Sequence, residues 1–341
     1  GTCTANITNN LSNRNLIING AMQVAQRGTS FTSLGAAYTL DRFRYTENID
    51  TGVVTVSQES ITDLTGFSKA LKINCTTAET GIPAKSGSKF AALNHHIEAQ
   101  NLQQLGYGSS GAKTITLSFY VKSNITGTFC VSIYKPDQTD RIISLGYTIN
   151  SANTWERKTL TYVGDTGGGG IDDNNGQGLS LYWIVARQQG YAGTAATTWA
   201  DNLDARFADP CTATIFENTN DHIMFTGVQL EVGHATDFEH RSYADELKRC
   251  ERYFEICAGG SVEYISTTGS YLEDVVQHRT VKRANPTVAI ISSDENFCQS
   301  VTAVGGDGSS KIYQSALRAN NPSLSGGIYY YYGRFSADSE L

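Results

Sequence analysis

The chain has 341 residues, of which only 17% are charged, and it carries a net charge of −7 with a sequence pI near 5.4. This acidic balance excludes nucleic acid as an expected partner, because binding to a phosphate backbone needs clustered Lys and Arg. The longest unbroken apolar run, Leu181 to Ala186, is far shorter than the roughly 20 residues of a membrane-spanning helix. We therefore expect no membrane insertion.

Short alternating segments dominate the first part of the chain. Within residues 113–124 every second residue is apolar, which is the period of a strand with one buried face. Similar segments recur up to Gly233, and the stretches between them, such as residues 166–178, are rich in Gly, Asn and Asp. After an extended polar arm over residues 1–13, the sequence predicts a mostly β fold with a jelly-roll β-sandwich over residues 14–240.

The pattern changes after Phe238, where a charged segment predicts one short α-helix over residues 241–256. Ser242 is suited to cap this helix, with Asp245 three residues later in the first turn. Four residues then follow at spacings of four, three and four and form an a/d seam: Tyr243, Leu247, Cys250 and Phe254. A helix this short needs a partner for its seam. Either the same helix of neighbouring subunits or the protein's own sandwich would supply it.

Beyond the helix the alternation resumes and predicts a small β-domain over residues 257–341. Its last segment contains four consecutive tyrosines, residues 329–332, whose rings would alternate between the two faces of a strand. The seven cysteines of the chain are odd in number, widely spaced and without CxxC pairs. This pattern favours free thiols, made in a reducing compartment, over a disulfide framework.

The sequence contains no catalytic or metal-binding signature, so we expect neither an enzyme nor a cofactor. P-loop, GxSxG and HExxH patterns are absent. Asp172 and Asp173 adjoin in a turn-forming loop, whereas glycoside hydrolysis needs two carboxylates facing each other across a cleft. His95 and His96 are neighbours in a predicted strand and point to opposite faces. Other loop carboxylates, such as Asp204, match no complete calcium-binding loop.

Aromatic side chains are the better candidates for a binding site, because sugars are held by flat rings together with Asn, Gln and Asp. Trp199 lies in a loop beside Asp201 and Asn202, which makes these three residues one candidate group. Anchoring of the long loop is the alternative role for Trp199. Tyr330 and Tyr332 form the second candidate group, either as a receptor surface or as a contact between subunits.

Several segments, in this order along the chain, resemble tail-fibre-type virion proteins of tailed bacteriophages, especially marine phages that infect cyanobacteria. They include "NLIINGAMQVAQRGTS", "TITLSFYVKS", "NTWERKT" and the stretch from "TGVQLEVG" to "RCERYF". The resemblance implies a non-enzymatic structural protein that forms a homotrimer through the seam of its helix. The same resemblance implies that the protein is made in the host cytoplasm and located in the virion. It also implies adhesion to a host cell-surface glycan and contacts with other virion proteins, which residues 1–13 are placed to make. A capsid decoration or head-fibre protein and a polysaccharide-degrading tailspike are the alternatives.

The first block also resembles a carbohydrate-binding module. In such modules the last strand of the jelly roll often carries a pair of Asp residues that helps to hold a structural calcium. Here Thr226 and Gly227 precede Val228 instead. The sequence therefore gives no support for a calcium site carried over from that family.

Overall fold

The computed structural model describes residues 14–191, 193, 196–265, 269–295, 300–305, 314–324 and 327–341. The predicted arm over residues 1–13 lies outside these ranges. The chain divides into two compact units, Gly1–Arg241 and Ser242–Leu341. This division falls one residue after the end that the sequence predicts for the jelly-roll domain. Among the helices of the described residues, none has the length and apolar character needed to cross a lipid bilayer.

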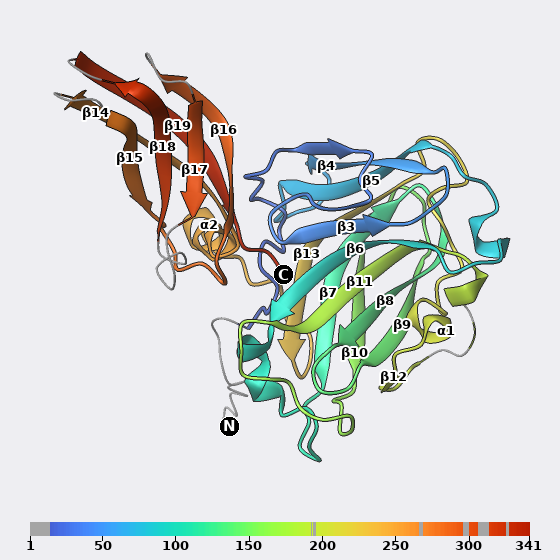
Figure 1. The fold of residues 1–341 in the computed structure, drawn as a ribbon. Coiled ribbons are helices and arrows are strands. Elements are labelled where there is room, and N and C mark those ends of the chain that lie inside the picture. Colours follow the sequence, from blue (N-terminus) through green and yellow to red (C-terminus); the bar gives the residue numbers. More distant parts are fainter. Residues whose placement is uncertain are drawn as a thin grey trace, which may run out of the picture. The chain divides into compact units, whose positions relative to one another are not determined.

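One layer of the first unit is a six-stranded antiparallel sheet (Figure 1). Its strands are, in spatial order, β1 (Ser30–Thr32), β4 (Val53–Ser60), β5 (Lys69–Thr77), β13 (His222–Val232), β7 (Ile115–Ser123) and β10 (Glu156–Tyr162). Strand β7 contains the segment whose alternation is clearest in the sequence, and its apolar members are buried.

The second layer is a seven-stranded antiparallel sheet. Its strands are, in spatial order, β12 (Ala200–Asp201), β9 (Arg141–Ile149), β8 (Gly127–Lys135), β11 (Gln177–Arg187), β6 (Phe90–Glu98), β3 (Phe43–Glu47) and β2 (Ala36–Tyr38). The two inner faces form one hydrophobic core, in which Trp183 of β11 meets Phe119 of β7 with 6.1 Å between ring centroids. The predicted β-sandwich is confirmed.

Short helices occupy the connections of this unit. They are the 3₁₀ helices η1 (Ile82–Ala84), η2 (Ala99–Leu105) and η3 (Gln189–Tyr191), and the four-residue α1 (Asp204–Phe207). Both η3 and α1 belong to the connection between β11 and β13. Figure 1 shows α1 beside β9 and β12, at the edge of the seven-stranded sheet.

The second unit begins with helix α2 (Tyr243–Glu251), and its described residues continue with six strands in two antiparallel sheets, which confirms a small C-terminal β-domain. One sheet has the order β14 (Phe254–Ile265), β19 (Gly327–Asp338), β16 (Thr287–Glu295). The other has the order β15 (Gly269–Gln277), β18 (Gln314–Leu324), β17 (Ser300–Gly305).

Helix α2 has the predicted N-cap, but it begins at Tyr243, two residues after the predicted start, and ends five residues early. The Ser242 hydroxyl accepts a hydrogen bond from the Asp245 amide at 3.2 Å, which is the expected N-cap. The helix stops at Glu251 rather than Ile256, because Phe254 opens strand β14 and is paired in register with Asp338 of β19. Strand pairing therefore replaces the last predicted turn.

The predicted seam does not form one continuous helical stripe. Tyr243 is 55% exposed and Leu247 is half-buried, whereas Cys250 and Phe254 are buried at 0% and 6% exposure. Cys250 and Phe254 are thus packed away and are not available to a neighbouring subunit. Of the four seam residues, Tyr243 and Leu247 keep the exposure that an intersubunit contact requires.

Candidate functional site

A cavity lined by aromatic rings lies on the outer face of the seven-stranded sheet, which is the face turned away from the six-stranded sheet. In β11, Leu181 and Trp183 point into the core, so Tyr182 between them points outward. Tyr134 of β8 takes the same outward phase, since its neighbours Ile133 and Lys135 are buried. The cavity measures about 290 Å³ and is lined by Phe90, Tyr134, Tyr182, Tyr191, Asn202, Asp204 and Phe207.

The connection between β11 and β13 builds the other wall of the cavity, and its rings hold it to the sheet. Phe207 of α1 meets Tyr182 and Phe90 edge to face, each with 5.0 Å between centroids. Tyr191 of η3 meets Phe90 in the same way at 5.3 Å. These offsets are the preferred geometry of aromatic pairs. All five rings are half-buried, so each keeps part of its surface open to solvent.

Small side chains on the sheet let α1 approach closely. The Ser144 hydroxyl of β9 donates to the carbonyl oxygens of Arg206 and Phe207, at 3.0 and 3.1 Å. Ser132 of β8 also donates to the Phe207 carbonyl. These bonds satisfy the carbonyl groups at the end of α1, which a helix leaves without partners of its own. The position of Phe207 is therefore fixed from both its side chain and its backbone.

The polar residues of the cavity lining are three tyrosines, one amide residue and one carboxylate residue, namely Tyr134, Tyr182, Tyr191, Asn202 and Asp204. Burial raises the pKa of Tyr134 to about 12, helped by its hydrogen bond to the Asp140 carboxylate. Burial and the charge of Asp204 raise the pKa of Tyr191. Burial also raises the pKa of Tyr182, and the positive charge of Arg44 partly offsets this rise. All three phenols thus stay protonated near neutral pH and are able to donate hydrogen bonds.

Trp199 does not present its ring to a ligand, contrary to its expected role in sugar binding. The side chain is only 8% exposed, and its Nε1 donates to the Val163 carbonyl at 2.7 Å. Its ring meets Tyr107 edge to face at 5.6 Å inside the core. Trp199 therefore anchors the loop, which is the alternative that the sequence left open. The indole is buried because it is large and apolar and because its N–H is satisfied by a carbonyl group inside the protein.

The neighbours of Trp199 remain at the surface. Asp201 is exposed and pairs with the Arg141 guanidinium at 3.3 Å, outside the cavity lining. Asn202 lines the cavity, and its backbone amide donates to the Asp140 carbonyl at 3.0 Å. Of the first candidate group, the structure thus brings only Asn202 to the cavity. The aromatic rings of that cavity come from residues other than Trp199.

The second candidate group lies in the other unit. Tyr332 of β19 is 53% exposed, whereas the side chain of Tyr330 lies outside the described part of the chain. The sequence did not single out the five cavity rings. A signal was present in Tyr182, an aromatic residue out of phase with the core residues around it, but the apolar run "LYWIVA" hid that phase.

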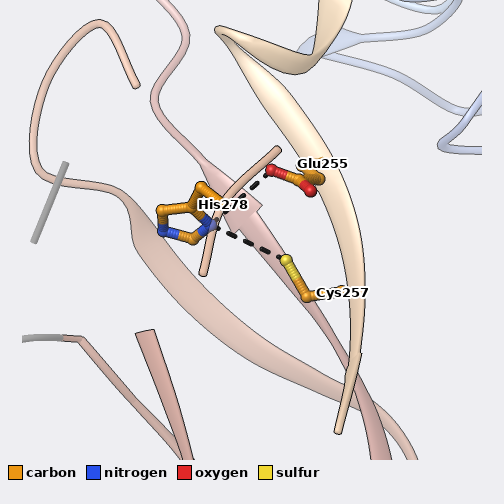
Figure 2. Close-up of side chains that lie close together, drawn as sticks. All are labelled: Glu255, Cys257 and His278. Carbon is orange, nitrogen blue, oxygen red and sulfur yellow. Dashed lines mark hydrogen bonds and ion pairs between the residues drawn. The ribbon is translucent and has the colours of Figure 1, made fainter. Parts of the chain in front are cut away.

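Three potential metal ligands come together in the second unit. Figure 2 shows Glu255 and Cys257 on β14 facing His278, whose Nδ1 is 3.6 Å from Glu255 Oε2 and 3.7 Å from Cys257 Sγ. The three ligand atoms lie within 4.8 Å of one another. However, the buried ammonium of Lys282 is 2.7 Å from Glu255 Oε2, and burial followed by the charge of Glu255 raises the pKa of Cys257 to about 12. This set is better described as a buried ion-pair network than as a metal site.

The residues at the position of the implied calcium do not fit that ion. The Thr226 side chain is a hydroxyl that donates to the Lys69 carbonyl at 2.8 Å. Gly227 has no side chain and takes a left-handed φ of 60°, at a bulge in the pairing of β13 with β7. Neither residue offers the carboxylate oxygens that calcium requires.

A comparison with models of known protein families finds no match, and a comparison with curated proteins finds none either. Among solved structures, the chain is similar to the enzymatically active domain of tailspike protein 4 of bacteriophage CBA120, with 15% identity and a TM-score of 0.35. That match covers 64% of this chain and 22% of the tailspike chain, so it spans about a fifth of that protein.

Two carbohydrate-binding modules are also similar to the chain. The xylan-binding domain from Paenibacillus barcinonensis has 14% identity and a TM-score of 0.32, over 60% of this chain and 99% of that domain. The family 11 module from Clostridium thermocellum has 10% identity and a TM-score of 0.29, over 61% of this chain and 98% of that module. Likenesses this weak carry no conclusion about the ligand of this protein.

Proposed function

We propose that this protein is a non-enzymatic adhesion subunit that binds a glycan in the aromatic cavity of its β-sandwich. The observation that carries the proposal is the convergence of five half-buried rings on a cavity of about 290 Å³ that also exposes Asn202 and Asp204. Ring faces hold the apolar face of a sugar, while amide and carboxylate groups bind its hydroxyls.

The same cavity favours binding over hydrolysis. Cleavage of a glycosidic bond uses two carboxyl groups that face each other across the scissile bond. Asp204 is the one carboxylate among the residues that line the cavity. The tyrosine hydroxyls beside it have raised pKa values and are poor acids near neutral pH.

The place of the protein in a virion is part of the proposal and rests on the sequence resemblance to phage tail-fibre proteins. We propose a homotrimer, with the exposed side of α2 at Tyr243 and Leu247 as a contact between subunits. A capsid decoration or head-fibre protein would share this fold and assembly. Antibody labelling of intact particles distinguishes these positions, because it would mark either the tail or the capsid.

Binding to a panel of immobilised bacterial polysaccharides tests the function. We expect the purified protein to bind at least one polysaccharide without releasing reducing ends. Tyr134→Ala removes a half-buried ring from the cavity and should abolish that binding. Tyr120→Ala is the matched control, since it removes a half-buried tyrosine of β7 that is not part of the cavity lining, and it should leave binding unchanged. Equal binding by Tyr134→Ala and the wild-type protein, with both folded, would exclude the cavity as the glycan site.

A further inference from the structure

We infer that the aromatic cavity recognises an organic ammonium group, either a quaternary ammonium or a protonated amine carried by the ligand. This inference deepens the proposed function, because it concerns the chemistry of the ligand in that same cavity. It stands on two independent features of the site, which are the ring surfaces and the charge of the lining.

The first feature is the set of rings. Aromatic faces carry negative electrostatic potential, and several faces around one hollow form the usual recognition site for alkylammonium groups. Here Phe207 contacts three other lining rings, those of Tyr182, Phe90 and Tyr191, with centroids 5.0 to 5.6 Å apart. Because neighbouring rings meet at steep angles, their faces turn in different directions around the hollow. A cavity of about 290 Å³ suits a single headgroup or one sugar unit.

The second feature is negative charge without a matching cation. Asp204 lines the cavity and is exposed, and it forms no ion pair within the described part of the chain. Asp140 adds a second carboxylate, hydrogen-bonded to the hydroxyl of Tyr134. No Lys or Arg is among the lining residues. A neutral ligand would leave this charge uncompensated, and an acidic sugar would be repelled by it.

Cations outside the lining oppose the inference, and Arg187, paired with Phe90 in the ladder of β11 and β6, and Arg206 of α1 are two of them. Arg44, on the neighbouring strand β3, acts electrostatically on Tyr182, although it is not part of the lining. Its charge should lower the affinity for an ammonium group. Arg44 therefore supplies a variant whose effect has a definite sign, since its removal should strengthen the binding of a cation.

A titration of the full chain with choline tests the inference. The control ligand is the neutral isostere of choline, in which a carbon atom replaces the quaternary nitrogen. Nuclear magnetic resonance shifts of the cavity tyrosines report binding of both ligands. We expect choline to bind more tightly than the isostere by roughly two- to thirtyfold, the range that one desolvated cation–π contact gives.

Two variants separate charge from shape. Asp204→Asn should weaken choline and leave the isostere unchanged, and Arg44→Gln should strengthen choline and again leave the isostere unchanged. Equal affinity for both ligands, or choline binding that Asp204→Asn does not alter, would overturn the inference. If either of these two results were obtained while the protein still bound a polysaccharide, the proposed glycan-binding function would remain intact. Absence of both kinds of binding would remove the function as well.

Discussion

The ring of Phe207 meets the ring of Tyr182 edge to face, with 5.0 Å between their centroids. Tyr182 belongs to the seven-stranded sheet, whereas Phe207 closes the short helix α1 in the connection between β11 and β13. This contact joins a regular element to an irregular one and creates a hollow between them. The rigid sheet thus positions one wall of the cavity, and the connection between β11 and β13 supplies the other wall.

Phe207→Leu should loosen the cavity more than it unfolds the protein. Leucine keeps most of the apolar volume but loses ring contacts that are worth about 0.5–1.5 kcal/mol each. Phe207 makes three such contacts, so we expect a fall in unfolding free energy of about 1.5–4.5 kcal/mol and a larger relative loss of ligand affinity. Phe67→Leu is the matched control, because that ring packs on Tyr120 and Phe238 away from the cavity lining. Equal loss of affinity in both variants would contradict a specific role for Phe207.

Lys135→Met should destabilise the first unit. The Lys135 ammonium is fully buried and contacts three acceptors, at 2.7 Å from the Gly169 carbonyl, 3.0 Å from the Gly168 carbonyl and 3.3 Å from Asp165. Removing one member of a buried ion pair costs roughly 3–5 kcal/mol, and we expect the lower end because Arg141 still pairs with Asp165. Urea denaturation measures this loss. Adding Asp165→Asn to the variant should recover part of it, and a further loss would contradict the explanation.

The alternation of the strands and the N-cap of α2 follow from local sequence, and the structure contains both. The cavity does not follow, because its lining comes from residues 90, 134, 182, 191, 202, 204 and 207, spread over three strands and a connection. The apolar run around Tyr182 hides the fact that this side chain leaves the core, and no local pattern places Phe207 opposite to it. Trp199 and Asn202 are three residues apart and reach opposite environments, since a loop has no period from which burial can be read. The early end of α2 depends on Asp338, the distant strand partner of Phe254.

His96 should make the first unit less stable in mild acid. Burial, followed by the charges of Arg42 and Arg44, lowers the pKa of His96 from 6.5 to about 3, and its Nδ1 lies 2.6 Å from the Ser180 hydroxyl. Between these two pKa values the unfolded chain binds a proton that the folded chain does not, so stability falls as the pH falls. From about pH 7 to about pH 5 the loss from this one group should be about 2 kcal/mol.

The contribution of His96 to the loss of stability is measured by urea denaturation. The midpoints of the wild-type protein and of His96→Gln are compared at about pH 7 and at about pH 5. Buried His95, whose pKa is also lowered, remains in both proteins and serves as an internal reference. The variant should therefore lose less stability on acidification than the wild type. An identical loss in the two proteins would show that His96 binds no additional proton on unfolding.

Glu255 should give the second unit a separate transition in stronger acid. Burial alone would raise its pKa, but His278, Lys282 and the Arg279 amide outweigh this effect and lower the value from 4.5 to about 2. The folded state then favours the ionised carboxylate. Its contribution is present in full above about pH 4.5, is lost as the pH falls towards 2 and amounts to at most about 3 kcal/mol. Hydrogen exchange in β14 should report the loss, and Glu255→Gln should remove this dependence on pH.

Leu247→Asp should separate the subunits of the proposed homotrimer. Leu247 is half-buried on α2, one turn after the exposed Tyr243, so a charge there would be placed in a contact between helices but would remain hydrated in a lone chain. We expect the wild-type mass in solution to be three times 36.9 kDa at micromolar concentration, and the variant to approach 36.9 kDa. Lys248→Asp introduces the same side chain at an exposed position about 100° around the helix, and it should remain trimeric. A wild-type monomer would refute the assembly, whereas a trimer that survives Leu247→Asp would place the contact on another surface, because α2 would then contribute too little to hold three chains together.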